Sequence, residues 1–170
     1  MEFRPVLRSL VALLKPHTYV ELGVLNGYTF NTISPLVKRA VAVDKNLLGG
    51  VTYLPNVEVM EMTTIEAARV FQGEIDILFI DANHEKSQVL EDFYNFSFFV
   101  KEGTGLIFLH DTCPASKRLT APKYCHNAWE AAWHIRQNHG NHFEIVTLPS
   151  HRAGLSIIRK SEKQLCINLP

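Results

Sequence analysis

Short apolar runs alternate along this chain with longer stretches in which apolar residues recur at helical spacing. Compact apolar runs of this length are typical of buried strands, and i, i+3, i+4, i+7 spacing is typical of helices that lie on a sheet. The runs that predict strands are 19–22, 40–43, 57–60, 75–80 and 106–109. The stretches that predict helices are 4–14, 26–38, a segment capped by Thr63 or Thr64 that ends at Phe71, 87–100 and 127–138.

Two further runs, 143–148 and 155–159, close the pattern and are joined by a segment with Pro149 and Gly154. They predict an antiparallel hairpin. Five alternations of strand and helix before this hairpin predict an α/β fold with an open, mostly parallel sheet and helices on both faces. Residues 1–170 form one predicted domain, with an N-terminal helix within 1–16. The tail, 161–170, is expected to be a loose end or a contact with another copy.

Two glycines, Gly23 and Gly27, stand where the first strand gives way to the next helix. Glycine adopts positive φ readily and allows close approach to the backbone. A turn of this kind presents backbone N–H groups to an anionic ligand. Tight packing between strand and helix is the alternative explanation for the same spacing.

The overall charge is balanced, with 17 basic and 17 acidic residues in 170. This balance gives no electrostatic reason to expect nucleic acid or an anionic membrane surface as a partner. No apolar run approaches the roughly 18 residues of a membrane span. The three cysteines are an odd number without a C-x-x-C pair, which favours a reduced, cytoplasmic setting.

Polar residues stand at the carboxyl ends of all five predicted parallel strands. In open α/β sheets these ends form the ligand crevice at the point where strand order reverses. The residues expected to meet there are Glu21, Gly23, Asp44, Met62, Thr63, Asp81, His110 and Asp111. Asp44 follows Gly23 by 21 residues, close to the spacing of an acidic residue that holds ribose hydroxyls. Capping of the following turn is the alternative role for this carboxylate.

These strand-end residues carry a resemblance to a known family. Glu21-Leu22-Gly23-x-x-x-Gly27-Tyr28-Thr29, Asp44 and Asp81 resemble the class I S-adenosylmethionine (SAM)-dependent methyltransferases, a group with a Rossmann-like seven-stranded sheet. The segments 79–84 and 107–111 are most similar to the catechol and macrolide-sugar O-methyltransferase-like bacterial groups. The resemblance covers about residues 17–160 and implies methyl transfer from SAM to a small-molecule hydroxyl.

The resemblance also implies a role for each cofactor-binding position. Glu21 and Gly23 would border the methionine part of SAM, and the carboxylate would meet a turn formed by Asn26, Gly27 and Thr29. Asp44 would hold the ribose. The adenine would lie beside Met62 and Thr63, and Asp81 would face the cofactor from the fourth strand.

In the metal-dependent relatives, the positions of Asp81, His110 and Asp111 hold a divalent cation, although His110 replaces an oxygen ligand. Two carboxylates and an imidazole suit Mn, Fe, Co or Zn better than Mg. His84 stands where the catechol enzymes carry a catalytic lysine, so it is a candidate base and equally a candidate ligand. A site without metal, in which Asp81 serves only the cofactor, is the alternative.

Two rival functions remain at the level of sequence: an NAD(P)-binding oxidoreductase, and a domain that binds SAM or a protein partner without catalysis. The glycine pattern is G-x-x-x-G and not G-x-G-x-x-G, which disfavours the first rival. Closure over the acceptor must come from residues 112–126, from 46–56 or from a second subunit. Trp129 and Trp133 are interpreted as core residues, and the phenylalanine-rich stretch 93–99 as a buried helix face with exposed members that could build a homodimer.

Overall fold

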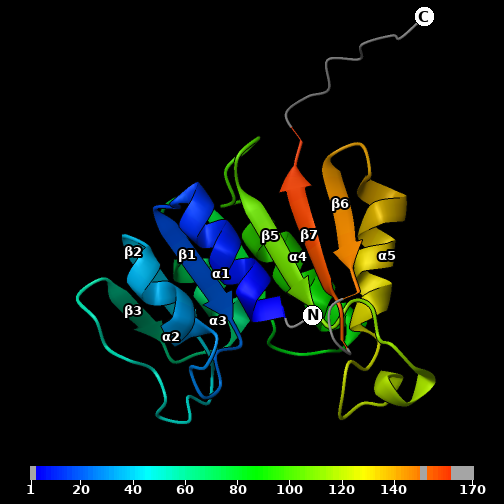
Figure 1. The fold of residues 1–170 in the computed structure, drawn as a ribbon, viewed down its shortest axis with the longest axis horizontal. Coiled ribbons are helices and arrows are strands. Elements are labelled where there is room, and N and C mark those ends of the chain that lie inside the picture. The colour runs from blue at the N-terminus through cyan, green and yellow to red at the C-terminus, as the bar shows by residue number, and fades with distance from the viewer. Residues whose placement is uncertain (1–2, 150–152, 162–170) are drawn as a thin grey trace, which may run out of the picture.

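The computed structural model describes residues 3–149 and 153–161, and the strands within these residues form one seven-stranded sheet (Figure 1). The strands are β1 (Thr18–Leu22), β2 (Arg39–Val43), β3 (Val57–Met60), β4 (Ile77–Ile80), β5 (Leu106–His110), β6 (Phe143–Leu148) and β7 (Leu155–Lys160). Their order is β3-β2-β1-β4-β5-β7-β6. The first five strands are parallel, and β7 is antiparallel to both β5 and β6. The predicted mostly parallel sheet with a C-terminal antiparallel hairpin is confirmed.

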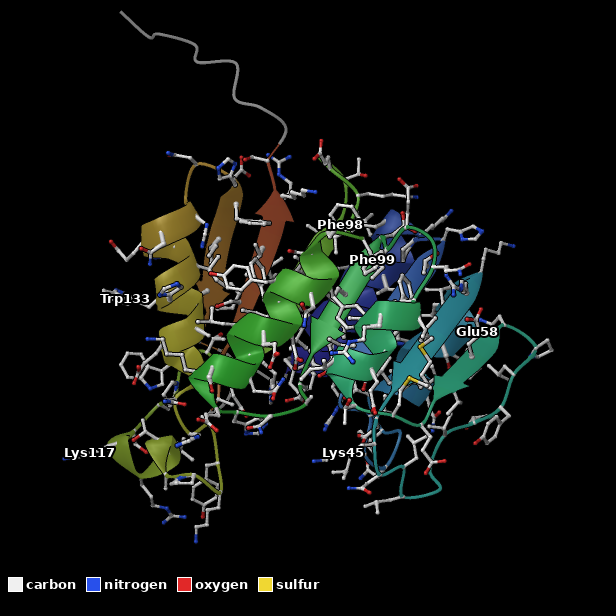
Figure 2. All side chains as sticks on the ribbon, turned by 180° about the vertical axis from the view of Figure 1, so that it is seen from behind. Lys45, Glu58, Phe98, Phe99, Lys117 and Trp133 are labelled. Carbon is white, nitrogen blue, oxygen red and sulfur yellow. The ribbon has the colours of Figure 1, made fainter. Side chains whose placement is uncertain are left out.

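Helices cover both faces of the sheet, as predicted. They are α1 (Phe3–Leu14), α2 (Phe30–Ile33), α3 (Thr64–Val70), α4 (Lys86–Ser97) and α5 (Ala128–His139), with 3₁₀ turns η1 (Ser34–Leu36) and η2 (Lys117–Thr120). Figure 1 shows α1 and α2 on the near face, and Figure 2 shows α3, α4 and α5 on the opposite face. Successive strand residues point to opposite faces. Tyr19 therefore packs with the α1 and α2 side, whereas Val20 and Leu22 pack with the α3, α4 and α5 side.

The strand register brings the carboxyl ends of the central strands to one level. Leu22 pairs with Val43 on one side and with Ile80 on the other. The order of strands reverses between β1 and β4, which is where open α/β sheets bind ligands. The residues that follow these three strand ends, Gly23, Asp44 and Asp81, therefore emerge side by side.

The predicted helix over 26–38 is wrong in extent. Residues before Phe30 form a turn, and the helical segment is broken into α2 and η1. Pro35 occupies the first turn of η1. Because proline lacks an N–H, it cannot continue the α-helical hydrogen bonds at this point. The predicted cap of α3 is confirmed: Thr63 and Glu66 form a capping box.

The tryptophans of α5 do not lie in the core, so that interpretation is wrong. Trp129 is 39% exposed and Trp133 is 59% exposed, and Figure 2 shows Trp133 on the outer side of α5. The helix packs on the sheet through its smaller apolar side chains, which include Ala131 and Ile135. The interpretation of 93–99 as a buried face with exposed members is confirmed, because Phe93 and Phe96 are buried and Phe98 is exposed.

Two cysteines, Cys113 and Cys125, are free thiols. The third lies in 162–170, outside the described residues, as does all of the predicted tail except Ser161. Within the part of the chain that the structure describes, no helix is long and apolar enough to cross a membrane.

Candidate functional site

Gly23 follows the end of β1 and packs closely against the start of the β4–α4 connection. Its φ is +88°, and a Cβ built on it would lie 2.3 Å from the Cα of Ala82 and 2.4 Å from the carbonyl oxygen of Asp81. Its N–H donates to the carbonyl of Val43 at 2.9 Å. A side chain at this position would push two strand ends apart, so the close approach requires glycine.

The turn after Gly23 is held by short-range hydrogen bonds. The Gly27 N–H donates to the carbonyl of Val24 at 2.9 Å, and the Asn26 side-chain oxygen accepts from the Tyr28 N–H at 3.2 Å. Thr29 is buried at the start of α2. The turn therefore has a defined shape on the rim of the crevice.

A cavity of about 690 Å³ opens at the carboxyl ends of β1, β4 and β5. It is lined by residues from the glycine turn, from the ends of the three strands and from α1. Those that the sequence predicted as site residues are Glu21, Gly23, Asn26, Thr29, Asp44, Asp81, His84, His110 and Asp111. The strand-end residues thus meet in one place.

Glu21 lies at the base of this cavity and is 1% exposed. The Tyr19 hydroxyl donates to its Oε2 at 2.5 Å. Burial raises the pKa of Glu21 well above its usual range, although the Tyr19 hydrogen bond and the Arg4 charge act in the opposite direction. A cationic ligand group in the cavity would favour the ionised carboxylate.

Arg4 is a cavity residue that the sequence did not reveal. It lies on α1, and its Nε donates to the Thr29 hydroxyl at 3.3 Å. Its guanidinium carbon lies 4.3 Å from the ring centroid of Tyr28, a cation–π arrangement. The remaining guanidinium N–H groups are suited to a carboxylate. The amphipathic pattern of α1 predicted its buried face but not which of its polar residues reaches the crevice.

A second cavity, of about 210 Å³, lies on the far side of Asp44, between β2, α3 and the start of α4. It contains two more of the predicted cofactor positions, Met62 and Thr63, together with Gln88, which the sequence did not reveal. Gly27, the last predicted position, lines neither cavity. Asp44 borders both cavities. Its carboxylate accepts from the Leu25 N–H at 2.7 Å and from the Asn46 N–H at 2.9 Å. Both oxygens of Asp44 retain a free acceptor position.

Two carboxylates and two imidazoles form a cluster at one end of the larger cavity. His84 Nδ1 lies 3.0 Å from Asp111 Oδ2, and His84 Nε2 lies 3.5 Å from Asp81 Oδ1. His110 Nδ1 lies 3.0 Å from Asp81 Oδ1 and 3.3 Å from Asp111 Oδ1. Asp81, His84 and Asp111 each offer a ligand atom, and these atoms all lie within 4.8 Å of one another.

The two carboxylates raise the pKa of both imidazoles. Hydrogen bonds to Asp111 and Asp81 raise the pKa of His84 to about 11, against the effect of burial. Burial lowers the pKa of His110, but the charge and hydrogen bond of Asp81 outweigh it and raise the pKa above its usual value. Burial raises the pKa of Asp81, but the charges and hydrogen bonds of His110 and His84 outweigh burial and lower the pKa below its usual value.

The surroundings fix the orientation of each imidazole. His84 Nδ1 contacts the carbonyl oxygen of Tyr124 as well as Asp111, and both partners are acceptors. Nδ1 therefore carries a hydrogen, and Nε2 faces Asp81. The ring of Phe3 lies against His110 with 4.3 Å between centroids. Asp111 has a φ of +61°, an unusual conformation for a residue other than glycine.

The loop between β5 and α5 is tied to the cluster at its C-terminal end. Besides the Tyr124 contact, the Asn127 side-chain oxygen accepts from the Lys86 N–H at 2.8 Å. At its N-terminal end, the Cys113 N–H donates to the carbonyl of Ala153 at 2.7 Å. The loop is therefore anchored on both sides. Figure 2 shows its residue Lys117 at the same end of the molecule as Lys45.

Solved structures with the same fold include methyltransferases. The O-methyltransferase TomG from Streptomyces achromogenes, solved with SAM, is 13% identical, with 94% of this chain and 79% of that chain covered and a TM-score of 0.71. An O-methyltransferase from Bacillus cereus, solved with SAH, is 15% identical, with coverage of 92% and 80% and a TM-score of 0.66. An rRNA methylase from Streptococcus thermophilus is 12% identical, with coverage of 92% and 95% and a TM-score of 0.70. At these identities the likeness establishes the fold.

A comparison with curated proteins finds no match. A family model described as a methyltransferase domain matches residues 20–112, which is more than half of the chain. The matched segment begins within β1, before Gly23, and ends just after Asp111. This chain therefore belongs to the methyltransferase-domain family.

Proposed function

We propose that this protein transfers the methyl group of SAM to a hydroxyl oxygen of a small molecule. The observation that carries the proposal is the continuity of the larger cavity. It joins the glycine turn and the buried Glu21 to the cluster of Asp81, His84, His110 and Asp111. One space thus offers groups suited to an amino-acid-bearing cofactor and groups suited to activating a hydroxyl.

The two cavities fit the parts of SAM in order. The methionine carboxylate binds the turn at Asn26 with Arg4 as its cationic partner, and Glu21 faces the ammonium and sulfonium charges. Asp44, which borders both cavities, accepts from the ribose hydroxyls. The adenine then enters the smaller cavity beside Met62.

The cluster also fits a divalent cation, because two carboxylates and an imidazole nitrogen converge within 4.8 Å. We assign Asp81, Asp111 and His84 as the residues that would hold it, the last through Nε2. The Nδ1 of His84 faces a backbone carbonyl, as in most metal-binding histidines. A bound cation would supply positive charge that lowers the pKa of the acceptor hydroxyl. The same charge would offset the effect of the two carboxylates on the pKa values of the imidazoles.

This assignment exchanges the roles suggested by the sequence pattern for the two histidines. His110 becomes the candidate base, because its Nδ1 faces Asp81 and its Nε2 remains available. The carboxylate orients the ring, and Phe3 packs against one of its sides. In this arrangement His110 Nε2 takes the acceptor proton, which leaves an oxygen nucleophile.

The methyl group then moves from the sulfonium to this oxygen, so the C–S bond breaks as the O–C bond forms. The products are S-adenosylhomocysteine (SAH), the methyl ether and a proton on His110. Opposite charges neutralise each other in this step, so positioning of the two reactants contributes most of the rate. The rigid turn at Gly23 and the strand ends provide that positioning.

Calorimetric titration tests the cofactor. SAH should bind with one site per chain, and NAD⁺ should not bind. Incubation with methyl-labelled SAM and a panel of phenols, catechols and sugars should then yield a product heavier by one methylene group. Binding of NAD⁺ without SAH would instead support the dinucleotide-dependent oxidoreductase.

Two matched variants test the exchange of histidine roles. His84→Gln should weaken Mn²⁺ binding by at least about 10-fold. His110→Gln should retain Mn²⁺ affinity within about 3-fold and lose at least about 100-fold in turnover. If His110→Gln loses the metal and His84→Gln retains it, the original sequence-based roles are correct.

A further inference from the structure

The smaller cavity has a buried carboxylate behind its wall that the proposed reaction does not use. Asp92 lies on α4 and has no exposed surface. Its Oδ1 accepts from the Thr64 hydroxyl at 2.5 Å and from the Gln88 side-chain nitrogen at 3.1 Å. Within the described residues its Oδ2 has no hydrogen-bond partner. A buried carboxylate without a cationic partner is costly, so its retention calls for an explanation.

Both hydrogen-bond donors of Asp92 line the smaller cavity. Thr64 begins α3, and Gln88 lies one helical turn before Asp92 on α4. Residues four apart on a helix share a face, which explains how the carboxylate reaches the Gln88 amide. Asp92 thus connects two elements that form the wall of the cavity.

The carboxylate determines which way the Gln88 amide is turned. Gln88 Nε2 lies 3.1 Å from Asp92 Oδ1 and 3.3 Å from Glu91 Oε2. Rotation of the amide by 180° would place its carbonyl oxygen against two carboxylate oxygens, which cannot donate when ionised. The amide nitrogen is therefore committed to the carboxylates. The carbonyl oxygen Oε1 forms no hydrogen bond within residues 3–149 and 153–161.

We propose that Gln88 selects adenine, its Oε1 accepting a hydrogen bond from the exocyclic amino group, and that Asp92 is the positioning residue that keeps Oε1 available. This inference rests on the proposed function, which places the adenine of SAM in this cavity. An acceptor at this point favours a base with an amino group. It disfavours hypoxanthine, whose carbonyl at the same position is also an acceptor.

The electrostatics of Asp92 agree with this role. Burial raises the pKa of Asp92 to about 6, although Thr64 and Gln88 hydrogen bonds oppose the rise. At neutral pH the carboxylate is therefore mainly ionised and acts only as an acceptor. A neutral asparagine would offer an amide nitrogen as well, and the Gln88 amide could then adopt either orientation.

Calorimetric titration of the full chain with SAH and with its deaminated analogue, S-inosylhomocysteine, tests the inference. The wild type should favour SAH by about 10- to 100-fold, because hypoxanthine leaves Oε1 facing another acceptor. Gln88→Met should bring the two affinities to within about 3-fold. Asp92→Asn should reduce the preference at least about 3-fold. Gln137→Met, an exposed position on α5, is the matched control and should keep the wild-type preference.

Each outcome separates this inference from the proposed function. Equal wild-type affinity for the two ligands overturns the role of Gln88 while leaving SAM binding intact. A Gln88→Met protein that retains the full preference overturns it as well, and circular dichroism of each variant establishes that the comparison concerns folded protein. Failure of the wild type to bind either ligand would contradict the proposed function itself.

Discussion

Replacement of Gly23 by alanine should both destabilise the fold and close the site. The added Cβ meets backbone atoms of Asp81 and Ala82 at 2.3–2.5 Å, and backbone cannot move aside as a flexible side chain can. Gly49 supplies a matched control. It also has a positive φ, +72°, but nothing lies within 4 Å of its Cβ position. The pair of variants separates the cost of backbone conformation from the cost of the clash.

The magnitudes follow from these two contributions. A non-glycine residue in the left-handed region costs about 1–2 kcal/mol, which both variants incur. Relief of the clash at Gly23 requires displacement of the β1 end from the β4 end, an overpacking cost of about 1–3 kcal/mol or more. Gly49→Ala should therefore lose about 1 kcal/mol, and Gly23→Ala about 4 kcal/mol. For a domain of this size these losses correspond to about 3 °C and about 12 °C in Tm.

Differential scanning calorimetry measures the two Tm values, and titration with SAH measures the effect on the site. Both cavities include Gly23, so the displaced strand ends should raise the Kd for SAH at least about 10-fold in Gly23→Ala. Gly49→Ala should stay within about 3-fold. Equal Tm losses in the two variants would refute the close approach of β1 to β4 described above.

Three further predictions concern charged residues. Because the folded protein holds the Asp92 proton more tightly than the unfolded chain does, with its pKa raised to about 6, stability should fall as pH rises from about 4 to 7. In urea unfolding of Asp92→Asn, the free energy of unfolding should fall by about 3 kcal/mol less over this pH range than in the wild type. The same fall in both proteins would contradict the burial of this carboxylate. Arg4→Gln should raise the Kd for SAH about 10-fold, whereas Arg8→Gln, at an exposed position on the same helix, should leave it within about 2-fold. Equal effects would argue against Arg4 as the partner of the SAH carboxylate. Asp111→Asn should lower kcat at least about 100-fold and keep the Kd for SAH within about 3-fold, and retained turnover would remove this residue from the chemistry.

The sequence predicted the convergence of the strand-end residues because parallel pairing leaves little freedom. Once the apolar runs are known to be adjacent parallel strands, the residues after them must emerge at one edge of the sheet. Glu21, Asp81 and Asp111 reach the same cavity for this reason. The match to the methyltransferase-domain family confirms the resemblance carried by these residues.

The helices contributed residues that no sequence pattern identified. Arg4 and Gln88 reach the cavities only because α1 and α4 lie on the sheet at particular angles and depths, and side-chain packing sets those angles. The helical period indicates which face is buried, but a polar residue at the edge of that face can point to solvent or to a crevice. The same uncertainty explains the error at Trp133, which shares a helix with small residues that take the buried positions.

The loop between β5 and α5 is anchored at Cys113, Tyr124 and Asn127, close to the residues assigned to chemistry. The Tyr124 and Cys125 N–H groups also donate to the carbonyls of Ala121 and Leu119, at 2.9 and 3.0 Å, whereas residues 114–118 form no backbone hydrogen bond with 113 or 124–127. Substitutions and insertions within 114–118 can therefore alter the accepted molecule without disturbing the cluster that we propose activates it. Under the proposed function, divergence among close relatives of this protein should concentrate in this segment, so that the acceptor changes while the strand-end residues stay the same.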